Sequence, residues 1–418
     1  MLKGLTHERY GQIMSETHKD PSGPLRGLRV LDVGTTIAGP LAATLMADFG
    51  ADVIKIEHPK LGDAMRHWDP FKEGTSLWWK MIGRNKRSIT LDLSCPEGKE
   101  IFLALVAEAD VVIENFRPGT LERWGLGYPE LRHANPGVIL VRISGYGQDG
   151  PYAERPGYGT IAEAMTGVPS FTGFPDNPPT LAAFPLADSV AAMFACFSAM
   201  FAIYERDRNG KREGQIIDVS LFEPLFRIVE SQVVAFDQLG QIKQQMGNRF
   251  AEEAPRNAYA TKDGGWIAIS CSTNRTFHRL ARAMEREDLI DDPRFLSNTS
   301  RVAKAEALDA IVADWFRTQE TAEAIQVLEA ADVVAGPMLT IDQILEHPQF
   351  VARKTVTTVE DAELGPIRMQ NVVPRFSRTP GTVRFAGPRK GEHTDDILAG
   401  ELGMDDDRIS KLREDGVV

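Results

Sequence analysis

An aspartate at the start of a long apolar run could either cap a helix or act as a nucleophile. Asp188 precedes the run from Val190 to Tyr204, with Pro185 before it and Gly210 after it. These flanking residues are helix start and stop signals, and they predict one buried helix. The carboxylate would lie near unpaired N–H groups and the positive end of the helix dipole, so it is either a cap or a reagent.

The simplest interpretation of Asp188 is an N-cap, since aspartate is among the residues preferred there. Its apolar neighbours instead indicate partial burial, which favours a functional reason for keeping a charge. Small residues around it would let a ligand approach the carboxylate: Ala183, Ala187, Ser189, Ala191 and Ala192. These features are compatible with nucleophilic catalysis, and the residues alone leave both interpretations open.

Other common catalytic motifs are absent from the sequence. It contains no G-x-S-x-G, no G-x-x-x-x-G-K-[ST] and no H-E-x-x-H. The cysteines Cys95, Cys196 and Cys271 are far apart and form no C-x-x-C pair, which favours a reducing compartment. We therefore expect neither a metal site nor a disulfide framework.

Residues 145–150 match the dinucleotide motif G-x-G-x-x-G and follow an expected strand. In a dinucleotide site, these glycines open a helix whose N-terminus receives the pyrophosphate. Here residues 151–159 contain two prolines and two more glycines. We therefore predict a loop at this position rather than a dinucleotide site.

The composition is that of a soluble globular protein, with 43% hydrophobic and 25% charged residues. The net charge of −12 disfavours binding to nucleic acid or acidic membranes, because both are negatively charged. The polar N-terminus lacks the apolar core of a signal peptide. The apolar run after Asp188 is also shorter than the roughly 18 to 20 residues that span a bilayer. We expect a cytoplasmic protein without membrane contact.

Strands and helices alternate in the first part of the chain. An expected strand at 28–33, a helix closed by Gly50 and a strand at 51–59 form one βαβ unit. Residues 87–116 repeat this succession, and a further strand ends near residue 145. Parallel strands joined by helices predict an α/β fold with a Rossmann-like large domain.

The middle of the chain has a different pattern. Residues 258–270 predict a β-hairpin around a Gly-containing turn, and stretches with helical spacing follow. We therefore predict a smaller α+β domain here. The expected parts are a polar leader at 1–24, the large domain at 25–225, the small domain at 226–330 and a C-terminal return to the large domain at 331–418.

The chain resembles the class III CoA-transferases, a family that includes carnitine CoA-transferases and formyl-CoA transferases. The resemblance runs from about Leu25 to Gly403, and it depends on the order, spacing and length of several segments together. The segments are 25–63, 85–102, 109–128, 143–159 and 185–195.

The resemblance implies that Asp188 is the catalytic aspartate. Its carboxylate would attack an acyl-CoA thioester to form an aspartyl anhydride, and CoA would then form an aspartyl-CoA thioester. An acceptor acid would reverse these steps and leave as its CoA thioester. A helix start suits this role because backbone N–H groups can stabilise the carboxylate and an adjacent oxyanion.

The resemblance also implies where CoA binds, as a substrate rather than a tightly bound cofactor. Ile37 and Ala38 match a turn near the thioester, and Tyr146 matches a residue near the thioester or the adenosine. The stretch from Leu91 to Ser94, together with His58, matches positions lining the adenine and ribose. The loop that holds the pantetheine and phosphates is matched by Asn115, Phe116, Arg117 and Arg123. A guanidinium such as that of Arg123 suits a phosphate, although a solvent-facing helix residue is an equal alternative without the resemblance.

Departures from the family pattern bear on the substrate. Formyl-CoA transferases have glutamine where this chain has Ile37, and a glycine run where it has residues 247–255, which disfavours formyl or oxalate substrates. Related acyl-CoA racemases carry a His-Asp pair where this chain has Tyr158 and Gly159. Proton abstraction requires a positioned base, so a transferase is favoured over a racemase or isomerase. A non-catalytic CoA-binding protein, with Asp188 only capping its helix, is the alternative from another class.

The resemblance further implies an interlocked homodimer in which each small domain contacts the other subunit's large domain. The small domain would then help to cover the active site, where Asn248 and Arg249 are candidates for contacting the acid; Arg249 is equally well interpreted as a surface residue. We expect an acyl-CoA and a small carboxylic acid as partners, with succinyl-CoA as the default donor.

Overall fold

The computed structural model describes residues 22–208, 210 and 212–418, so most of the leader predicted at 1–24 lies outside the described residues. The chain forms two compact units. Unit 1 contains the described residues up to Thr166, together with Ala182–Glu230 and Gln349–Val418, and unit 2 contains Gly167–Leu181 and Ser231–Pro348. These bounds differ from the predicted ones because residues 167–181 and 331–348 make most of their contacts with the smaller unit.

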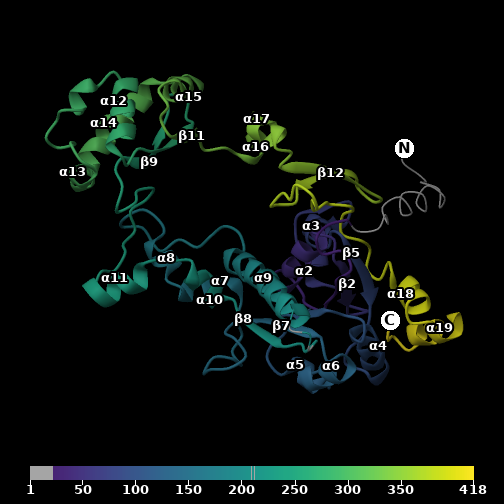
Figure 1. Ribbon diagram of the computed structural model, residues 1–418. Helices are drawn as coiled ribbons and strands as arrows, with labels where there is room; N and C mark the ends of the chain where they lie inside the picture. The colour runs from purple at the N-terminus through teal and green to yellow at the C-terminus, as the bar shows by residue number, and fades with distance from the viewer. Residues whose placement is uncertain (1–21, 209, 211) are drawn as a thin grey trace. The chain divides into compact units, whose positions relative to one another are not determined.

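Unit 1 is built on strands and helices that alternate along the chain (Figure 1). Its first half contains β1 (Arg29–Asp32), α2 (Ala38–Asp48), β2 (Asp52–Glu57), η1 (Ala64–His67), β3 (Phe71–Lys72), β4 (Thr75–Ser76), α3 (Leu77–Ile82), β5 (Lys86–Thr90), α4 (Pro96–Val106), β6 (Val111–Glu114), α5 (Thr120–Arg123), α6 (Tyr128–Ala134) and β7 (Ile139–Ser144). It continues with α7 (Gly159–Met165), α9 (Leu186–Arg208), β8 (Ile216–Ser220), α10 (Phe222–Arg227), α17 (Pro348–Ala352, whose first residue belongs to unit 2), β12 (Val356–Asp361), β13 (Gly365–Gln370), α18 (Thr394–Gly400) and α19 (Asp406–Glu414).

A six-stranded parallel sheet is the centre of unit 1. Its strand order is β5-β2-β1-β6-β7-β8, and every pairing is parallel. The direction of winding reverses between β1 and β6, as it does in doubly wound dinucleotide-binding folds. The prediction of an α/β fold with a parallel, Rossmann-like sheet is therefore confirmed. Residues 145–158 form no helix, as predicted for the loop that follows β7.

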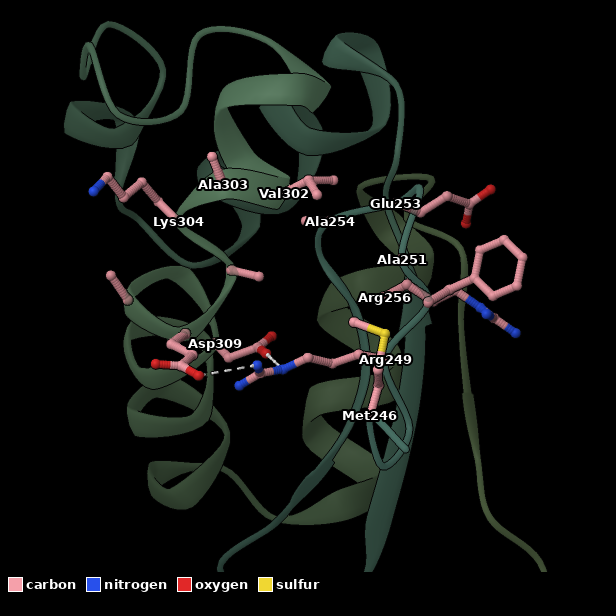
Figure 2. A pocket seen from close by; sticks show the side chains of 14 residues that line it. Met246, Arg249, Ala251, Glu253, Ala254, Arg256, Val302, Ala303, Lys304 and Asp309 are labelled. Carbon is pink, nitrogen blue, oxygen red and sulfur yellow. Dashed lines mark hydrogen bonds and ion pairs between the residues drawn. The ribbon is translucent and has the colours of Figure 1, made fainter. Parts of the chain in front are cut away.

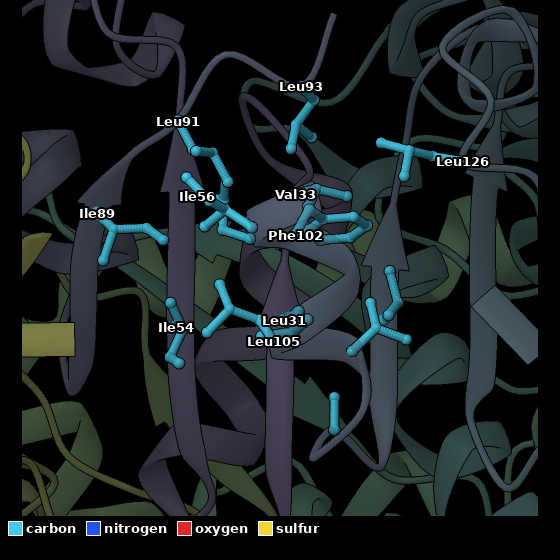
Figure 3. Close-up of a cluster of buried hydrophobic side chains, with 14 of the residues drawn as sticks. Leu31, Val33, Ile54, Ile56, Ile89, Leu91, Leu93, Phe102, Leu105 and Leu126 are labelled. Atoms are coloured by element: carbon cyan, nitrogen blue, oxygen red, sulfur yellow. The ribbon is translucent and has the colours of Figure 1, made fainter. Parts of the chain in front are cut away.

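Helices cover both faces of this sheet, so its central strands are buried. On one face, Leu31, Ile54 and Ile89 cluster with Phe102 and Leu105 of α4 (Figure 3). Helices α6, α18 and α19 add to the same hydrophobic cluster. Side chains alternate between faces along a strand, so the other face is left for α2, which contacts β1, β2 and β6, and for α9, which contacts β7 and β8.

The long helix α9 matches the predicted start and stop signals. It runs from Leu186 to Arg208, and Gly210 follows it with a φ of 69°, a left-handed conformation that glycine adopts easily. Its inner face consists mainly of alanines, which allow close packing on α2, α10 and the sheet. Its outer face carries exposed large apolar side chains: Met193, Phe197, Phe201 and Tyr204. The prediction of a buried helix therefore holds for the alanine face of α9 and is wrong for this outer face.

By length and composition, α9 is the one helix of the described residues that could cross a membrane. Its most apolar 18-residue window is 44% buried in the structure. A helix in the core of a globular unit passes the same test, and the alanine face of α9 packs on the sheet.

Four charged side chains are buried together beneath the carboxyl ends of β1, β2 and β5. Lys86 Nζ lies 2.8 Å from Asp32 Oδ2, and Lys55 Nζ lies 3.6 Å from Asp32 Oδ1 and 3.0 Å from Asp63 Oδ2. Lys55 also donates to the Gly34 carbonyl, and Lys86 donates to the Pro40 carbonyl at 2.6 Å. The network therefore joins three strands to the turn between β1 and α2.

The C-terminal residues complete unit 1. His393 donates its backbone N–H to the Ser88 carbonyl at 2.9 Å, and Asp92 donates to the Val417 carbonyl at 2.8 Å. These bonds hold the last helices beside β5. Upstream of them, β12 and β13 form an antiparallel hairpin.

Unit 2 is a small α+β unit with its own hydrophobic core. Its elements are α8 (Val168–Phe171), α11 (Gln232–Leu239), β9 (Arg256–Ala260), β10 (Trp266–Ser270), α12 (Asn274–Ala283), η2 (Glu287–Leu289), α13 (Asn298–Ala303), α14 (Ala305–Thr318), α15 (Thr321–Ala330), β11 (Ala335–Pro337) and α16 (Ile341–Glu346). The antiparallel pair β9–β10 is the predicted hairpin, and β11 adds a third strand.

Replacing Lys86 with methionine should destabilise unit 1. The substitution leaves the buried Asp32 with a weaker counter-charge, and breaking a buried ion pair typically costs about 3 kcal/mol of unfolding free energy. We expect a lower midpoint of urea unfolding for Lys86→Met. The matched control, Arg413→Met, removes an exposed pair with Asp395 and should leave the midpoint unchanged. Equal midpoints for the two variants would contradict the importance of the network.

Candidate active site

A cavity of about 480 Å³ opens at the carboxyl ends of β1, β2 and β5 in unit 1. Loops that follow parallel strands meet at this edge, and ligands bind there in doubly wound sheets near the point where the winding reverses. The cavity is lined by Val33, Gly34, Thr35, Lys55, Ile56, Glu57, His58, Leu61, Gly62, Asp63, Leu91, Asp92, Leu93, Ser94, Phe116 and Trp124. Its wall is therefore partly apolar and partly formed by the buried charge network.

Four residues predicted to bind CoA line this one cavity. His58 follows β2, Leu91 and Ser94 follow β5, and Phe116 follows β6. The Ser94 backbone N–H and hydroxyl both donate to Asp92 Oδ1, at 2.9 and 2.6 Å, which orders this turn. The structure thus brings together residues from three strand ends that are far apart in the sequence.

Asn115 lies next to the cavity rather than among its lining residues. Its side chain accepts from the Thr35 N–H at 2.7 Å and donates to the Thr35 carbonyl at 2.8 Å. A Cβ on Gly34 would lie 3.0 Å from Asn115 Oδ1, so glycine permits this approach. The amide therefore joins the turns that follow β1 and β6 across the reversal point of the sheet.

The remaining predicted positions lie outside the cavity lining. Ile37 and Ala38 are buried at the start of α2. Arg117 is exposed, and so is Arg123, whose Nη2 donates to the Thr120 hydroxyl at 2.8 Å. Tyr146 is half-buried in the loop after β7 and packs edge-on against Tyr152, with ring centroids 5.6 Å apart.

Sequence reasoning missed several cavity residues. Trp124 contacts Phe116 edge-on, with ring centroids 5.2 Å apart, and contributes apolar wall. Glu57 is held by Arg66, whose Nε and Nη2 donate at 2.7 Å each. A usable signal was present, since Glu57 lies near the end of an expected strand, and strand ends are where α/β sheets bind ligands.

Asp188 is the third residue of α9 and is half-buried. The Ser189 N–H donates to the Pro185 carbonyl at 3.0 Å, so the cap position falls on Pro185 and not on Asp188. The interpretation of Asp188 as an N-cap is therefore wrong. Its carboxylate still lies in the first helical turn, where the helix dipole favours negative charge.

A neighbouring glycine borders the Asp188 carboxylate closely. A Cβ built on Gly159, the first residue of α7, would lie only 2.0 Å from Asp188 Oδ2. Any larger residue at 159 would force the carboxylate or the backbone to move. The close approach of α7 to α9 therefore requires glycine at position 159. This contact also limits the positions that the Asp188 carboxylate can occupy.

Burial, together with the nearby charge of Glu163, raises the pKa of Asp188 to about 6, although a hydrogen bond from its own backbone N–H opposes this rise. A carboxylate with a raised pKa is more basic than an ordinary aspartate and is a better nucleophile once ionised. The first turn of α9 thus holds a half-buried carboxylate with a raised pKa.

Unit 2 contains a separate cavity of about 450 Å³ that includes the loop matched to the family's glycine run (Figure 2). Arg249 lines it, with its Nε 2.7 Å from Asp309 Oδ2 and its Nη1 3.6 Å from Glu306 Oε1. The hydroxyl of Tyr259 and the amide of Asn257 also donate to Asp309. Arg249 is therefore engaged within unit 2, and its contact with an acid stays a prediction.

Comparison with known proteins identifies the family. The model of CoA-transferase family III matches residues 25–394. The chain is 43% identical to the succinyl-CoA–D-citramalate CoA-transferase of Chloroflexus aurantiacus, over 95% of this chain and 99% of that protein. It is 41% identical to the succinyl-CoA–L-malate CoA-transferase beta subunit of the same organism, over 94% and 98%.

A solved structure agrees with these matches. The crystal structure of a CAIB/BAIF family protein from Brucella suis has a TM-score of 0.81 and 33% identity, and it covers 91% of this chain and 99% of that one. The chain belongs to CoA-transferase family III. It is an enzyme that transfers CoA from an acyl-CoA to an acid, which confirms the predicted activity.

Replacing Gly159 with alanine should reduce CoA transfer strongly without unfolding the protein. The new methyl group would displace the Asp188 carboxylate, and a misplacement of about 1 Å can cost roughly 100-fold in rate. Steady-state transfer assays, with circular dichroism as a check on folding, would measure this. The matched control is Gly400→Ala, which meets no atom within 4 Å and should keep full activity. A fully active Gly159→Ala enzyme would show that the carboxylate is not confined by this contact.

Proposed function

We propose that Asp188 is the covalent nucleophile of CoA transfer. The observation that carries this proposal is the half-buried carboxylate in the first turn of α9, confined against Gly159 and made more basic by burial. The small inner residues of α9 give the carboxylate a rigid mount on the sheet.

The proposed mechanism has four steps and consumes neither water nor a net proton. The Asp188 carboxylate attacks the donor thioester carbonyl, the C–S bond breaks, and an anhydride and CoA thiolate form. The thiolate then attacks the Asp188 acyl carbon and releases the donor carboxylate, leaving an aspartyl-CoA thioester. An acceptor carboxylate attacks the aspartyl carbonyl of that thioester, the C–S bond breaks, and a new anhydride and CoA thiolate form. The thiolate then attacks the acceptor carbonyl of this anhydride and releases the Asp188 carboxylate. The products are the acceptor's CoA thioester and free Asp188.

We propose that the cavity at the carboxyl ends of β1, β2 and β5 holds the adenosine end of CoA. His58, Leu91 and Ser94 lie together there, with Phe116 and Trp124 as an apolar wall. We assign the phosphates and the pantetheine arm to the segment from Asn115 through Arg117 to Arg123. Both arginines are exposed, and guanidinium groups form paired hydrogen bonds with phosphate oxygens.

We propose succinyl-CoA as the donor and a small hydroxy-dicarboxylic acid as the acceptor. The relatives named for succinyl-CoA with D-citramalate or L-malate support this choice, because they match nearly the whole chain at 43% and 41% identity. An acyl-CoA racemase is the rival enzyme. It is disfavoured because Tyr158 is 74% exposed and Gly159 has no side chain, so neither provides a proton-abstracting base.

We also propose an interlocked homodimer in the cytoplasm, without nucleic-acid or membrane partners. The exposed apolar face of α9 supports association with a second copy, since such a stripe would otherwise face water. The net charge of −12 and the three dispersed cysteines support the other parts of this proposal.

Trapping the covalent intermediate tests the nucleophile. After incubation with succinyl-CoA, borohydride should reduce an aspartyl-CoA thioester and hydroxylamine should capture an anhydride, and mass spectrometry should locate both at Asp188. Asp188→Asn should lose the label and all but a trace of activity. Asp207→Asn, in the last turn of the same helix, should keep both. Exchange of the acyl-CoA alpha proton with deuterium oxide, without a label, would instead support a racemase.

The pH dependence of transfer should report the ionisation of Asp188. Attack requires the carboxylate form, and the pKa of Asp188 is about 6, so kcat/KM for succinyl-CoA should fall as the pH decreases through about 6. An unperturbed aspartate would place this fall near about pH 4. Full activity maintained down to pH 5 would contradict the proposed state of the nucleophile.

A further inference from the structure

A second carboxylate, Glu163, lies buried on α7 close to the start of α9. Only 4% of its surface is exposed. Its Oε1 is 3.4 Å from the backbone nitrogen of Ala187, the residue that precedes Asp188. Gly159, which borders the Asp188 carboxylate, lies one helical turn earlier on α7. The face of α7 formed by residues 159 and 163 is therefore directed at the first turn of α9.

No lysine or arginine of the described residues forms an ion pair with Glu163. This is unusual for a buried carboxylate, because burying a charge is costly unless it is paired. Two other buried acids of unit 1 form ion pairs: Asp48 with Arg84, and Glu114 with Arg142. A buried acid without a cation is a candidate for a functional role.

The other elements packed on α9 hold no charged group that acts on Asp188 in the same way. Helix α9 contacts α2, α7, α10, β7 and β8. Besides Glu163, the charged side chains on these elements are Asp48, Arg142, Asp218, Glu223 and Arg227. Glu163 is the one of these whose charge contributes to the raised pKa of Asp188. Among the charged groups on these elements, the one that raises the pKa of Asp188 therefore comes from α7.

We propose that Glu163 is a positioning residue for Asp188 that anchors the first turn of α9 through the Ala187 amide and opposes the negative charge on the nucleophile. This inference rests on the proposed role of Asp188. Repulsion between like charges destabilises the free carboxylate, and it disappears when Asp188 becomes a neutral anhydride or thioester. Glu163 thus favours the acylated states of Asp188 without touching the substrate.

The test is the pH profile of Glu163→Gln with succinyl-CoA as donor and L-malate as acceptor. Glutamine keeps the shape and the oxygen acceptor for Ala187 but removes the charge. We expect the acid limb of kcat/KM to move to lower pH by about 0.5 unit or more, because Asp188 then ionises more easily. The plateau rate should fall, because a less basic carboxylate is a weaker nucleophile. Glu163→Asp, which retains the charge, should restore the wild-type limb.

Glu223→Gln is the matched control, because it removes an exposed carboxylate from α10, which also packs on α9. It should leave the acid limb unchanged. An acid limb in Glu163→Gln identical to that of the wild type would overturn the inference, even if its activity were lower. A purely structural role would give that result, since thermal unfolding midpoints and plateau rates can fall while the ionisation of Asp188 stays the same.

The outcomes separate this inference from the proposed function. If Asp188→Asn abolishes the covalent label but Glu163→Gln leaves the acid limb in place, only the role of Glu163 fails. If Asp188→Asn remains active, the nucleophile itself is misassigned. A shifted limb in Glu163→Gln together with loss of the label in Asp188→Asn would support both.

Discussion

Unit 1 depends on a group of charges buried beneath the carboxyl edge of its sheet. The two buried lysines, Lys55 and Lys86, are tolerated because their positive charges are neutralised by ion pairs with Asp32 and Asp63. Burial lowers the pKa of Lys86, whereas for Lys55 the charges of Asp32, Asp63 and Glu57 outweigh burial and raise it. A network that is satisfied in one arrangement fixes the register of β1, β2 and β5 and the path of the turn after β1. An uncharged core would hold the same strands together but would specify this turn less strictly.

The cavity proposed for the adenosine end of CoA depends on that arrangement. Lys55 and Asp63 belong both to the network and to the cavity wall, so the residues that stabilise the sheet edge also shape the site. The proposed nucleophile has a different support. Asp188 is carried by α9, whose alanine face packs closely on α2 and on the sheet. The proposed binding cavity and the proposed nucleophile therefore belong to one compact unit but are held by separate sets of contacts.

Much of this architecture could be predicted because it depends on local pattern. The alternation of strands and helices identified the parallel sheet, and Pro185 and Gly210 marked the ends of α9. The exposed face of α9 could not be predicted, since apolar residue types show that a face avoids water but not what covers it. Tertiary contacts were also hidden. Gly159 and Glu163 meet the first turn of α9 only because two helices pack together, and spacing along the chain carries no sign of that. The alternative in which Asp188 caps its helix failed because the helix begins three residues earlier, an error of the size expected when helix ends are predicted from sequence.

The close contact between Gly159 and Asp188 has a consequence for which acid can occupy position 188. The Asp188 carboxylate already contacts the backbone of α7, so the distance between α7 and α9 limits the length of the side chain at position 188. A glutamate would carry its carboxylate one methylene farther, into space that the α7 backbone occupies. The space between α7 and α9 therefore fits aspartate rather than glutamate at position 188. Side-chain length, and not only the presence of a carboxylate, decides which acid can stand there.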